Sequence, residues 1–298
     1  MVTPSGFGSG ANLDIYLSGA NRIYYVLTDS GVSSVFFFRY GTLDSNGSIS
    51  WSIPEQSIGT HYLTHAYGDS ITVDSSGTIW AAVMTYHPDV QLFKSPDGIT
   101  WSRVFVALGQ LYDPILLSLQ KSGGVALVYG STEARYSPIT IVFSTNGGSS
   151  WTSFPENSNF TIISSSAVSL VSASNGKDTI YFAGLSSRGT VDFWTYQIGA
   201  TSISNYQTLF NLEGTWSVSI SGRGSNLVVA FGAQSMVYSI SSSNQGITWS
   251  EVTPISASQN NVMQVGTSAN INGAGRAGVV WRSGSVEPFT VNFSRALD

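Results

Sequence analysis

Tryptophan residues that recur at a regular interval are the sequence feature that most constrains the fold of this chain. Trp51, Trp101 and Trp151 follow one another at intervals of 50 residues, and Trp249 comes 98 residues later. Each closes a short segment of Ser, Asp, Asn and Gly, here called a tryptophan turn: Asp44–Trp51, Ser95–Trp101, Ser144–Trp151 and Ser242–Trp249. Repetition at such a period predicts an architecture built from one supersecondary unit per repeat.

A second series of segments runs in phase with the tryptophan turns. Each has a polar turn followed by a short run of β-branched and aromatic residues, as in Asp74–Val83, Lys121–Val128 and Asn175–Phe182. Gly and Asn adopt the positive φ that tight hairpins need, and the apolar runs favour strands. No segment shows the 3.6-residue period of a helix. Each repeat therefore predicts four antiparallel strands, the pattern of a propeller blade.

Six repeats of this length fill the 298 residues. We expect a single all-β domain over residues 1–298, a six-bladed β-propeller with four-stranded antiparallel blades. Because an open ring leaves an edge strand exposed, we expect Leu13–Leu17 to lie beside the last strand, Thr290–Ser294. A β-solenoid is the alternative, but its repeats are shorter. The blades are expected at residues 12–55, 63–108, 112–156, 160–210, 214–256 and 261–298.

The tryptophan turns resemble the Asp-box (BNR) repeat, Ser/Thr-x-Asp-x-Gly-x-Thr-Trp. Ser144–Trp151 and Ser242–Trp249 match it with Asn in place of Asp, Ser95–Trp101 is one residue shorter, and Asp44–Trp51 is a looser copy. The resemblance implies a propeller with Asp-box turns and the fold of the sialidase-like superfamily. Families with these boxes include sialidases, sortilin-type receptors, xyloglucan hydrolases and binding proteins, so the resemblance implies little about function.

The residues of these turns are expected to serve the fold. An Asx side chain can accept hydrogen bonds from nearby backbone N–H groups and so stabilise its own turn. We expect this role for Asp97, Asn146 and Asn244. We expect the tryptophans of the same three turns to pack between sheets.

Composition limits the classes of partner. The chain has 12 Lys+Arg, 17 Asp+Glu, a net charge of −5 and no cysteine. Nucleic-acid binding needs clustered Lys and Arg, so no nucleic-acid partner is expected. The missing cysteines exclude disulfides, thiolate zinc sites and cysteine catalysis. No stretch is long and apolar enough to predict a membrane span.

The surface is expected to be rich in Ser, Thr, Asn, Gln and Tyr, whose hydrogen bonding does not change near neutral pH. We therefore expect an exposed protein of a harsh, acidic and hot setting, such as that of a thermophile. Its location would be extracellular, at a cell surface or on a virion. The first 11 residues lack the basic start and apolar run of a signal peptide. A leader is expected to have been removed, or the protein leaves the cell another way.

Strand order divides a propeller into two faces. The tryptophan turns lie on one face, and the loops between second and third strands lie on the other with the blade connections; we call it the loop face. Loops on a rigid scaffold usually carry function, and aromatic rings beside directional polar groups suit a glycan. Ligand binding is predicted for one sector of the loop face: His65, Tyr67, Tyr86, His87, Tyr112 and Tyr136.

If this sector bound a metal ion, His65, His87 and Asp89 would be its ligands. Neutral imidazoles and a carboxylate can hold a transition metal, but no metal-site signature accompanies these residues. We expect a hydrogen-bonded rim there, with no metal and no other cofactor.

A sialidase-like glycoside hydrolase is the alternative function that the resemblance implies. Such enzymes use three arginines around a carboxylate, a Tyr–Glu nucleophile pair and an Asp acid/base. Asp14-Ile-Tyr-Leu stands where the first arginine is expected, and Arg22 comes one strand later, so we lean away from an enzyme. For hydrolysis by two carboxylates, as in the xyloglucan-type relatives, Asp69 and Asp113 are the candidate pair. The other candidate catalytic residues are Glu133, Arg135, Arg188 and Arg282.

The favoured function is a recognition or adhesion module that binds a glycan or another cell-surface ligand. A third reading is a structural subunit whose low-charge surface packs against other subunits of a surface assembly. Three Asn-x-Ser/Thr sequons further predict a glycoprotein modified at Asn46, Asn159 and Asn292.

Overall fold

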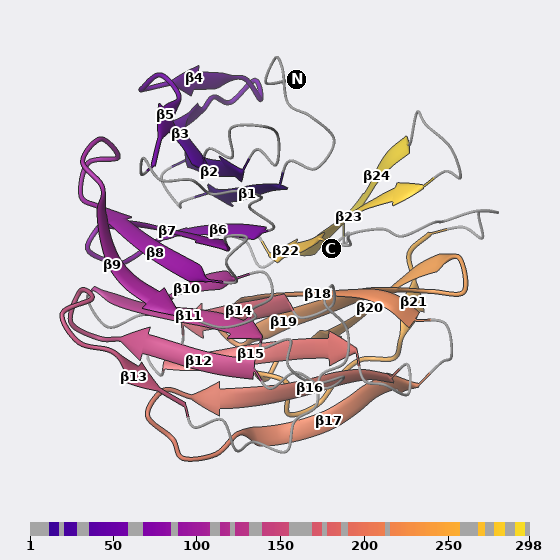
Figure 1. Cartoon of the computed structure of the whole chain (residues 1–298). Helices are drawn as coiled ribbons and strands as arrows, with labels where there is room; N and C mark the ends of the chain where they lie inside the picture. The colour runs from indigo at the N-terminus through magenta and orange to yellow at the C-terminus, as the bar shows by residue number, and fades with distance from the viewer. Residues whose placement is uncertain are drawn as a thin grey trace. The chain divides into compact units, whose positions relative to one another are not determined.

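In the computed structural model every regular element of the described residues is a β-strand (Figure 1). The expectation of a chain nearly free of helix is confirmed for these residues. None of them forms a helix with the length and apolar character needed to span a membrane. The structure describes residues 12–17, 21–28, 36–58, 68–84, 89–107, 114–119, 123–130, 139–154, 169–174, 178–185, 190–211, 215–256, 268–271, 277–283 and 290–295.

The first of two compact units, Met1–Glu156, contains three sheets whose strands pair antiparallel in chain order. The first sheet has β1 (Asn12–Leu17), β2 (Arg22–Thr28), β3 (Phe36–Leu43), β4 (Ile49–Trp51) and β5 (Gln56–Ser57), with β4 and β5 both paired to β3. The second has β6 (Gly68–Val73), β7 (Ile79–Met84), β8 (Val90–Ser95) and β9 (Ser102–Ala107). The third has β10 (Ile115–Leu119), β11 (Gly124–Gly130), β12 (Ile139–Ser144) and β13 (Thr152–Ser153).

The second unit, Asn157–Asp298, contains three more sheets of the same antiparallel order. The fourth sheet has β14 (Ser169–Ser174), β15 (Asp178–Leu185), β16 (Thr190–Gln197) and β17 (Ser204–Asn211). The fifth has β18 (Thr215–Arg223), β19 (Asn226–Ala233), β20 (Met236–Ser242) and β21 (Thr253–Pro254). The sixth has β22 (Ser268–Ile271), β23 (Ala277–Ser283) and β24 (Thr290–Arg295).

One detail of the predicted architecture is wrong in the described residues, because the sheets do not all have four strands. Four sheets have four strands, the first has a fifth because β5 also pairs with β3, and the sixth has three. Leu13–Leu17 belongs to β1, which pairs with β2 in register from Asn12↔Thr28 to Leu17↔Ile23, and its place beside Thr290–Ser294 stays a prediction. Only four residues separate β1 from β2, so the local hairpin closes at little entropic cost. Whether the chain is a single domain remains a prediction.

Apolar cores fill the space between successive sheets within each unit. In the first unit, Val26 and Phe38 meet Ala81 and Val83 of the second sheet. All six residues of β7 are buried, because one face of that strand turns to the first sheet and the other to the third. A central strand covered on both faces explains a continuous apolar run where a half-exposed strand would alternate.

Three of the four tryptophan turns share one set of side-chain hydrogen bonds. A serine Oγ accepts from the N–H of a glycine at 2.8–2.9 Å, in the pairs Ser95–Gly98, Ser144–Gly148 and Ser242–Gly246. An Asx Oδ1 accepts from the N–H just before the tryptophan at 2.8–3.0 Å, in the pairs Asp97–Thr100, Asn146–Ser150 and Asn244–Thr248. The turn-stabilising role expected for these Asx side chains is therefore confirmed.

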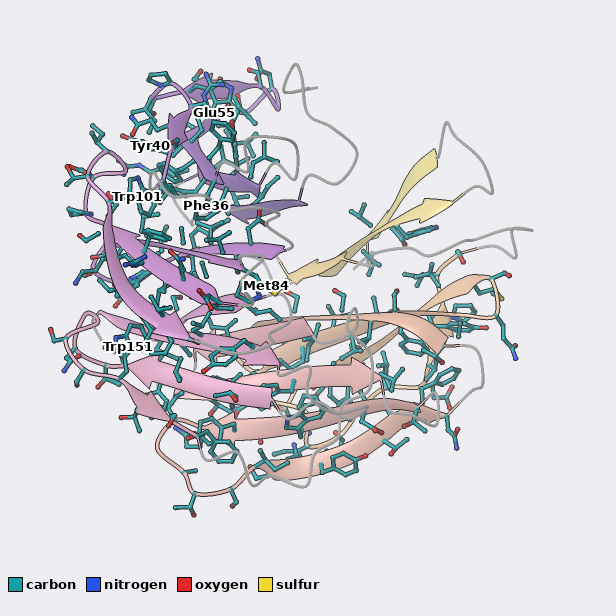
Figure 2. The ribbon with its side chains drawn as sticks, viewed as in Figure 1. Phe36, Tyr40, Glu55, Met84, Trp101 and Trp151 are labelled. Atoms are coloured by element: carbon teal, nitrogen blue, oxygen red, sulfur yellow. The ribbon has the colours of Figure 1, made fainter. Side chains whose placement is uncertain are left out.

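The tryptophans of these three turns also pack as expected, each edge-on to an aromatic ring of the preceding sheet; Trp101 and Trp151 are labelled in Figure 2. Ring centroids are 4.9 Å apart for Phe38–Trp101, 6.2 Å for Trp80–Trp151 and 4.9 Å for Phe193–Trp249, with interplanar angles of 71°, 86° and 74°. Offset and edge-on ring pairs stabilise a core beyond the area that they bury. These turns therefore join neighbouring sheets.

Candidate functional site

The first tryptophan turn departs from the other three. Asn46 Oδ1 accepts from Ser48 N at 2.9 Å, whereas the donor in the other turns is the residue just before the tryptophan, two positions later. Asp44, in the place of the usual serine, accepts from the hydroxyls of Ser48 and Ser50 at 3.2 and 2.9 Å. Trp51 ends strand β4 and stands opposite Gly41 of β3. Trp51 is therefore held within the first sheet, where its ring contacts Tyr25 and Arg39.

Four side chains on one face of the first sheet form what we call the Trp51 cluster: Tyr25, Arg39, Trp51 and Glu55. Tyr25 of β2 stands directly opposite Arg39 of β3, and Trp51 stands opposite the residue two positions beyond Arg39. Residues two apart in a strand share a face, so register alone brings three of the four together. This face points away from the second sheet, because alternate residues such as Val26 enter the core between the two sheets.

The geometry of the Trp51 cluster is specific. The guanidinium carbon of Arg39 lies 4.4 Å from the centroid of the Trp51 ring, within the range of a cation–π contact. The Tyr25 ring meets Trp51 edge-on, with centroids 5.4 Å apart and an interplanar angle of 86°. Arg39 Nε donates to the carbonyl oxygen of Ile53 at 3.1 Å, which fixes the plane of the guanidinium. The Tyr25 hydroxyl donates to Glu55 Oε2, and Glu55 is labelled in Figure 2.

Burial is graded across the Trp51 cluster. Tyr25 is 6% exposed, Arg39 and Trp51 are half-buried, and Glu55 is exposed. Burial raises the pKa of the Tyr25 hydroxyl, the hydrogen bond to Glu55 raises it further, and nearby Arg39 opposes the shift. The hydroxyl therefore stays protonated at neutral pH and holds the Glu55 carboxylate beside the aromatic rings.

Gly41 makes the close approach of β4 to β3 possible. A Cβ at this position would lie 2.6 Å from Ser50 O and 3.0 Å from Trp51 Cα, closer than real side chains allow. Any larger residue would move β4 away and separate the Trp51 ring from Arg39. A glycine in a strand often marks such a close backbone contact.

The chemistry of the Trp51 cluster is that of binding. It offers a cation with directional donors, an exposed carboxylate acceptor and a half-buried aromatic ring. Glycoside hydrolysis in its usual form needs two carboxyl groups about 5–9 Å apart, and the cluster contains one. It contains none of the residues named above as catalytic candidates.

All six residues of the predicted loop-face site lie outside the described residues and stay predictions: His65, Tyr67, Tyr86, His87, Tyr112 and Tyr136. The same holds for Asp113, Glu133, Arg135 and Arg188 of the catalytic alternative. Asp69 is described, half-buried in β6 opposite Val83. Asp89 directly precedes β8. In the described part of the chain, no group of three or more His, Asp or Glu could hold a metal ion.

The remaining predicted positions are described in part. Arg282 lies in β23 and Asn292 in β24, and their side chains are outside the description. Asn159 also lies outside it. Asn46 is exposed in the first tryptophan turn, so modification there stays a prediction at an accessible position.

The sequence patterns predict no role for Tyr25, Arg39, Trp51 or Glu55. One signal is present in the sequence, because Asp44–Trp51 matches the repeat less well than the other three turns. In the structure Trp51 contacts Tyr25 and Arg39 of its own sheet, whereas the other three tryptophans pack against an aromatic ring of the preceding sheet.

Comparison with known proteins supports the fold. No protein-family model and no curated protein matches the chain. Among solved structures, it is similar to the BP39L lectin from Burkholderia pseudomallei, with a TM-score of 0.72 and 12% identity over 98% of this chain and 84% of that one. It is also similar to the Aleuria aurantia lectin in complex with Fucα1-6GlcNAc, with a TM-score of 0.67 and 12% identity over 97% and 96% of the two chains.

Another structure of the Aleuria aurantia lectin is described as a six-bladed β-propeller with a novel fucose recognition mode. It matches this chain with a TM-score of 0.64 and 12% identity over 97% of this chain and 96% of that one. Similarity at this level of identity shows the fold alone. The chain is therefore an all-β propeller with antiparallel four-stranded blades.

Proposed function

We propose that this β-propeller binds carbohydrate and that the Trp51 cluster is a sugar-binding site. The observation that carries the proposal is the stacking of Arg39 on Trp51 beside an exposed carboxylate. A sugar ring has an apolar C–H face that packs on an aromatic ring, and hydroxyl groups that can donate to a carboxylate and accept from a guanidinium. The similarity to solved lectins supports the same function.

The finer features of the fold belong to the same proposal. We infer that the tryptophan turns are Asp-box repeats, since the Ser95, Ser144 and Ser242 hydroxyls and the Asx side chains make matching hydrogen bonds. We also propose that the protein acts outside the cell or on a virion, as an adhesion or recognition module. The low charge of 29 charged residues in 298 supports an exposed, pH-tolerant surface.

The loop-face residues remain a second predicted contact region for the same ligand. Tyr86 and Tyr112 are its most informative members, because each pairs an aromatic face with a hydroxyl. Binding that is lost in a Tyr86→Ala/Tyr112→Ala variant, and kept when the Trp51 cluster is changed, would move the site to the loop face.

A glycan array tests the proposal directly. We expect specific binding that falls at least tenfold, about 1.4 kcal/mol, in Trp51→Ala and in Glu55→Gln. Glu251→Gln is the matched control, since Glu251 is also exposed and lies outside the Trp51 cluster. Near-UV circular dichroism would show that each variant is folded. Unchanged binding by Trp51→Ala would contradict the assignment of the site, and an array without any bound glycan would contradict the function.

The same protein should be incubated with a panel of fluorogenic glycosides. Turnover that disappears in Glu133→Gln or Arg135→Leu would favour the glycoside hydrolase. No turnover is expected from the Trp51 cluster itself, because it holds one carboxylate.

A further inference from the structure

Two tryptophan turns contain the dipeptide Asn-Gly at the same place in the repeat. They are Asn46-Gly47 in the first turn and Asn146-Gly147 in the third. An asparagine side chain reacts most readily with its own backbone when glycine follows it, because glycine has no side chain to hinder the approach. The two turns therefore present one reactive sequence in two surroundings. The pairs Asn175-Gly176 and Asn272-Gly273 lie outside the described residues.

The reaction open to these asparagines is deamidation. The backbone nitrogen of the glycine attacks Cγ of the asparagine and gives its proton to solvent, the Cγ–Nδ2 bond breaks, and ammonia leaves. The product is a succinimide ring that joins side chain and backbone. Water then opens the ring at either carbonyl, which leaves aspartate or isoaspartate. The net change replaces the amide NH2 by a hydroxyl group from water, and it needs no oxidant, reductant or other reactant.

At Asn146, hydrogen bonds hold every atom that must move. Oδ1 accepts from Ser144 Oγ at 2.9 Å and from Ser150 N at 3.0 Å, so both ends of the turn hold the carbonyl group. The leaving nitrogen Nδ2 donates to Ser150 Oγ at 2.8 Å. The attacking nitrogen, Gly147 N, donates at 3.0 Å to the carbonyl oxygen of Gly123, in the connection between β10 and β11.

The third turn is also fixed to the preceding sheet. Trp151 lies edge-on to Trp80, and Lys94 Nζ donates to Gly147 O at 2.7 Å. A backbone that must rotate to bring Gly147 N onto the side chain would therefore disturb contacts with another sheet. This surrounding opposes ring closure.

At Asn46 the hydrogen bonds are fewer and local. Oδ1 accepts from Ser48 N at 2.9 Å and from Ser48 Oγ at 2.5 Å. Nδ2 has no hydrogen-bond partner among the described residues. Gly47 N donates to Asp44 O at 2.9 Å, a bond that closes this turn alone. Residues 45–48 are exposed, and a Cβ at Gly47 would have nothing within 4 Å, so the turn has room to change shape.

The two donors of Ser48 also favour the reaction. A carbonyl oxygen gains negative charge when a nucleophile adds to its carbon, and donors already directed at it stabilise that charge. Both donors at Asn46 belong to one neighbouring residue and can follow the side chain toward Gly47 N. The donors at Asn146 belong to Ser144 and Ser150, so the same movement breaks at least one of their hydrogen bonds.

We propose that Asn46 is a site of spontaneous deamidation in the folded protein and that the fold protects Asn146. This inference does not depend on the proposed function. The product places a second carboxylate beside Asp44, which already accepts from the Ser48 hydroxyl. Isoaspartate also lengthens the backbone just before β4, the strand that carries Trp51. A sugar on the predicted sequon would substitute Nδ2, the leaving nitrogen, so glycosylation at Asn46 would block the reaction.

Peptide mapping by mass spectrometry tests the proposal on the full chain made in a bacterium without N-glycosylation. The protein is held at pH 8 and 37 °C, and aspartate and isoaspartate are quantified over time at both positions. We expect formation at Asn46 to be at least about tenfold faster than at Asn146, because several hydrogen bonds must break at Asn146. In concentrated urea, which removes the hydrogen bonds of both turns, the two rates should agree within about threefold.

Ser150→Ala removes the hydroxyl that accepts from Asn146 Nδ2, so it should raise the rate at Asn146 and leave the rate at Asn46 unchanged. Ser149→Ala is the matched control and should change neither rate, because exposed Ser149 contributes only its backbone N–H to the turn. Equal rates at Asn46 and Asn146 in the folded protein would overturn the proposal. A difference of the same size in urea would overturn it too, since the difference would then come from the sequence.

Discussion

At the scale of single residues, two positions in a hairpin carry backbone strain. Gln234 and Ser235 connect β19 to β20 between the paired residues Ala233 and Met236. Their φ angles are 47° and 64°, so both adopt the left-handed conformation of a type I′ turn. Asn-Gly is the sequence that best tolerates this turn, and other L-residues lose about 1 kcal/mol each in that region.

Replacing Gln234 by Asn and Ser235 by Gly should therefore stabilise the protein. We expect a gain of ~1 kcal/mol in the free energy of unfolding, measured by urea denaturation. Ser225→Gly is a matched control, since Ser225 occupies the second position of the turn between β18 and β19 without a positive φ. Glycine at position 225 gives the unfolded chain more conformational freedom, so Ser225→Gly should slightly lower the free energy of unfolding. An equal change in the free energy of unfolding for Ser225→Gly and for Gln234→Asn/Ser235→Gly would contradict the explanation.

Asp97 makes one tryptophan turn sensitive to acid. The backbone N–H groups of Thr100 and Ile99 lower the pKa of its carboxyl below the ordinary value of 3.8. A carboxyl with a lowered folded pKa contributes stability above its unfolded pKa, and this contribution is lost as pH falls through the folded pKa. Asn146 and Asn244 make the same turn without a titrating group.

Asp97→Asn should accordingly remove the acid sensitivity of this turn. We expect the melting temperature of the original protein to fall faster than that of the variant below pH ~4, where the Asp97 carboxylate takes up a proton. Thermal unfolding followed by circular dichroism over this range is the measurement. If the melting temperatures of the two proteins fell equally as the pH is lowered, the ionised carboxylate would contribute nothing to the stability of this turn.

At the scale of elements, the tryptophan turn acts as a joint between sheets. Its ring contacts the preceding sheet, and side chains of that sheet donate to its glycine carbonyls. Lys94 Nζ reaches Gly147 O at 2.7 Å, and the amides of Asn205 and Gln207 reach Gly246 O at 3.1 and 2.6 Å. A ring contact and hydrogen bonds together fix both the separation and the register of the two sheets.

Gly246→Ala should break such a joint. A Cβ at Gly246 would overlap the Phe193 ring, and the φ of +82° is itself unfavourable for alanine. Gly199→Ala is the control, because Gly199 has a φ of +85° and nothing within 4 Å of its Cβ position. We expect Gly199→Ala to cost about 1 kcal/mol and Gly246→Ala at least 3 kcal/mol. If urea denaturation showed that both variants lose the same free energy of unfolding, the contact between the turn and the Phe193 ring would be able to shift without loss of stability.

The tryptophan turns and the strands were predictable because they depend on local sequence. Asp97, Asn146 and Asn244 bond within a few residues, so their roles could be inferred from spacing. The Trp51 cluster could not be predicted, because it depends on the register of β2 against β3 and on a contact between Tyr25 and Glu55, 30 residues apart.

At the scale of the whole molecule, several charged side chains of the described residues are hydrogen-bonded to neutral partners. The buried carboxylate of Asp74 accepts from Trp80 Nε1 at 2.8 Å and from backbone N–H groups. Asp192 accepts from threonine hydroxyls, and Lys94 donates to a carbonyl. With 29 charged residues in 298, long-range charge interactions contribute little to stability.

Unfolding should therefore be almost independent of ionic strength. Between 0.02 and 0.3 M NaCl, we expect the melting temperature at pH 7 to change by less than about 2 °C, because screening acts on exposed charge pairs. Differential scanning calorimetry is suited to this test. A change of about 5 °C or more would reveal a charge network that supports the fold.

The order of strands also bears on how the chain is made. Each sheet uses one contiguous stretch, so that β6 to β9 require nothing beyond Gly68–Ala107. A nascent chain can complete one sheet before the residues of the next have left the ribosome, and it can then add the following tryptophan turn to an aromatic ring already in place. β-Proteins with long-range pairings must wait for distant strands and leave edges exposed meanwhile. Synthesis from the N-terminus can build this molecule in the order in which its parts are encoded.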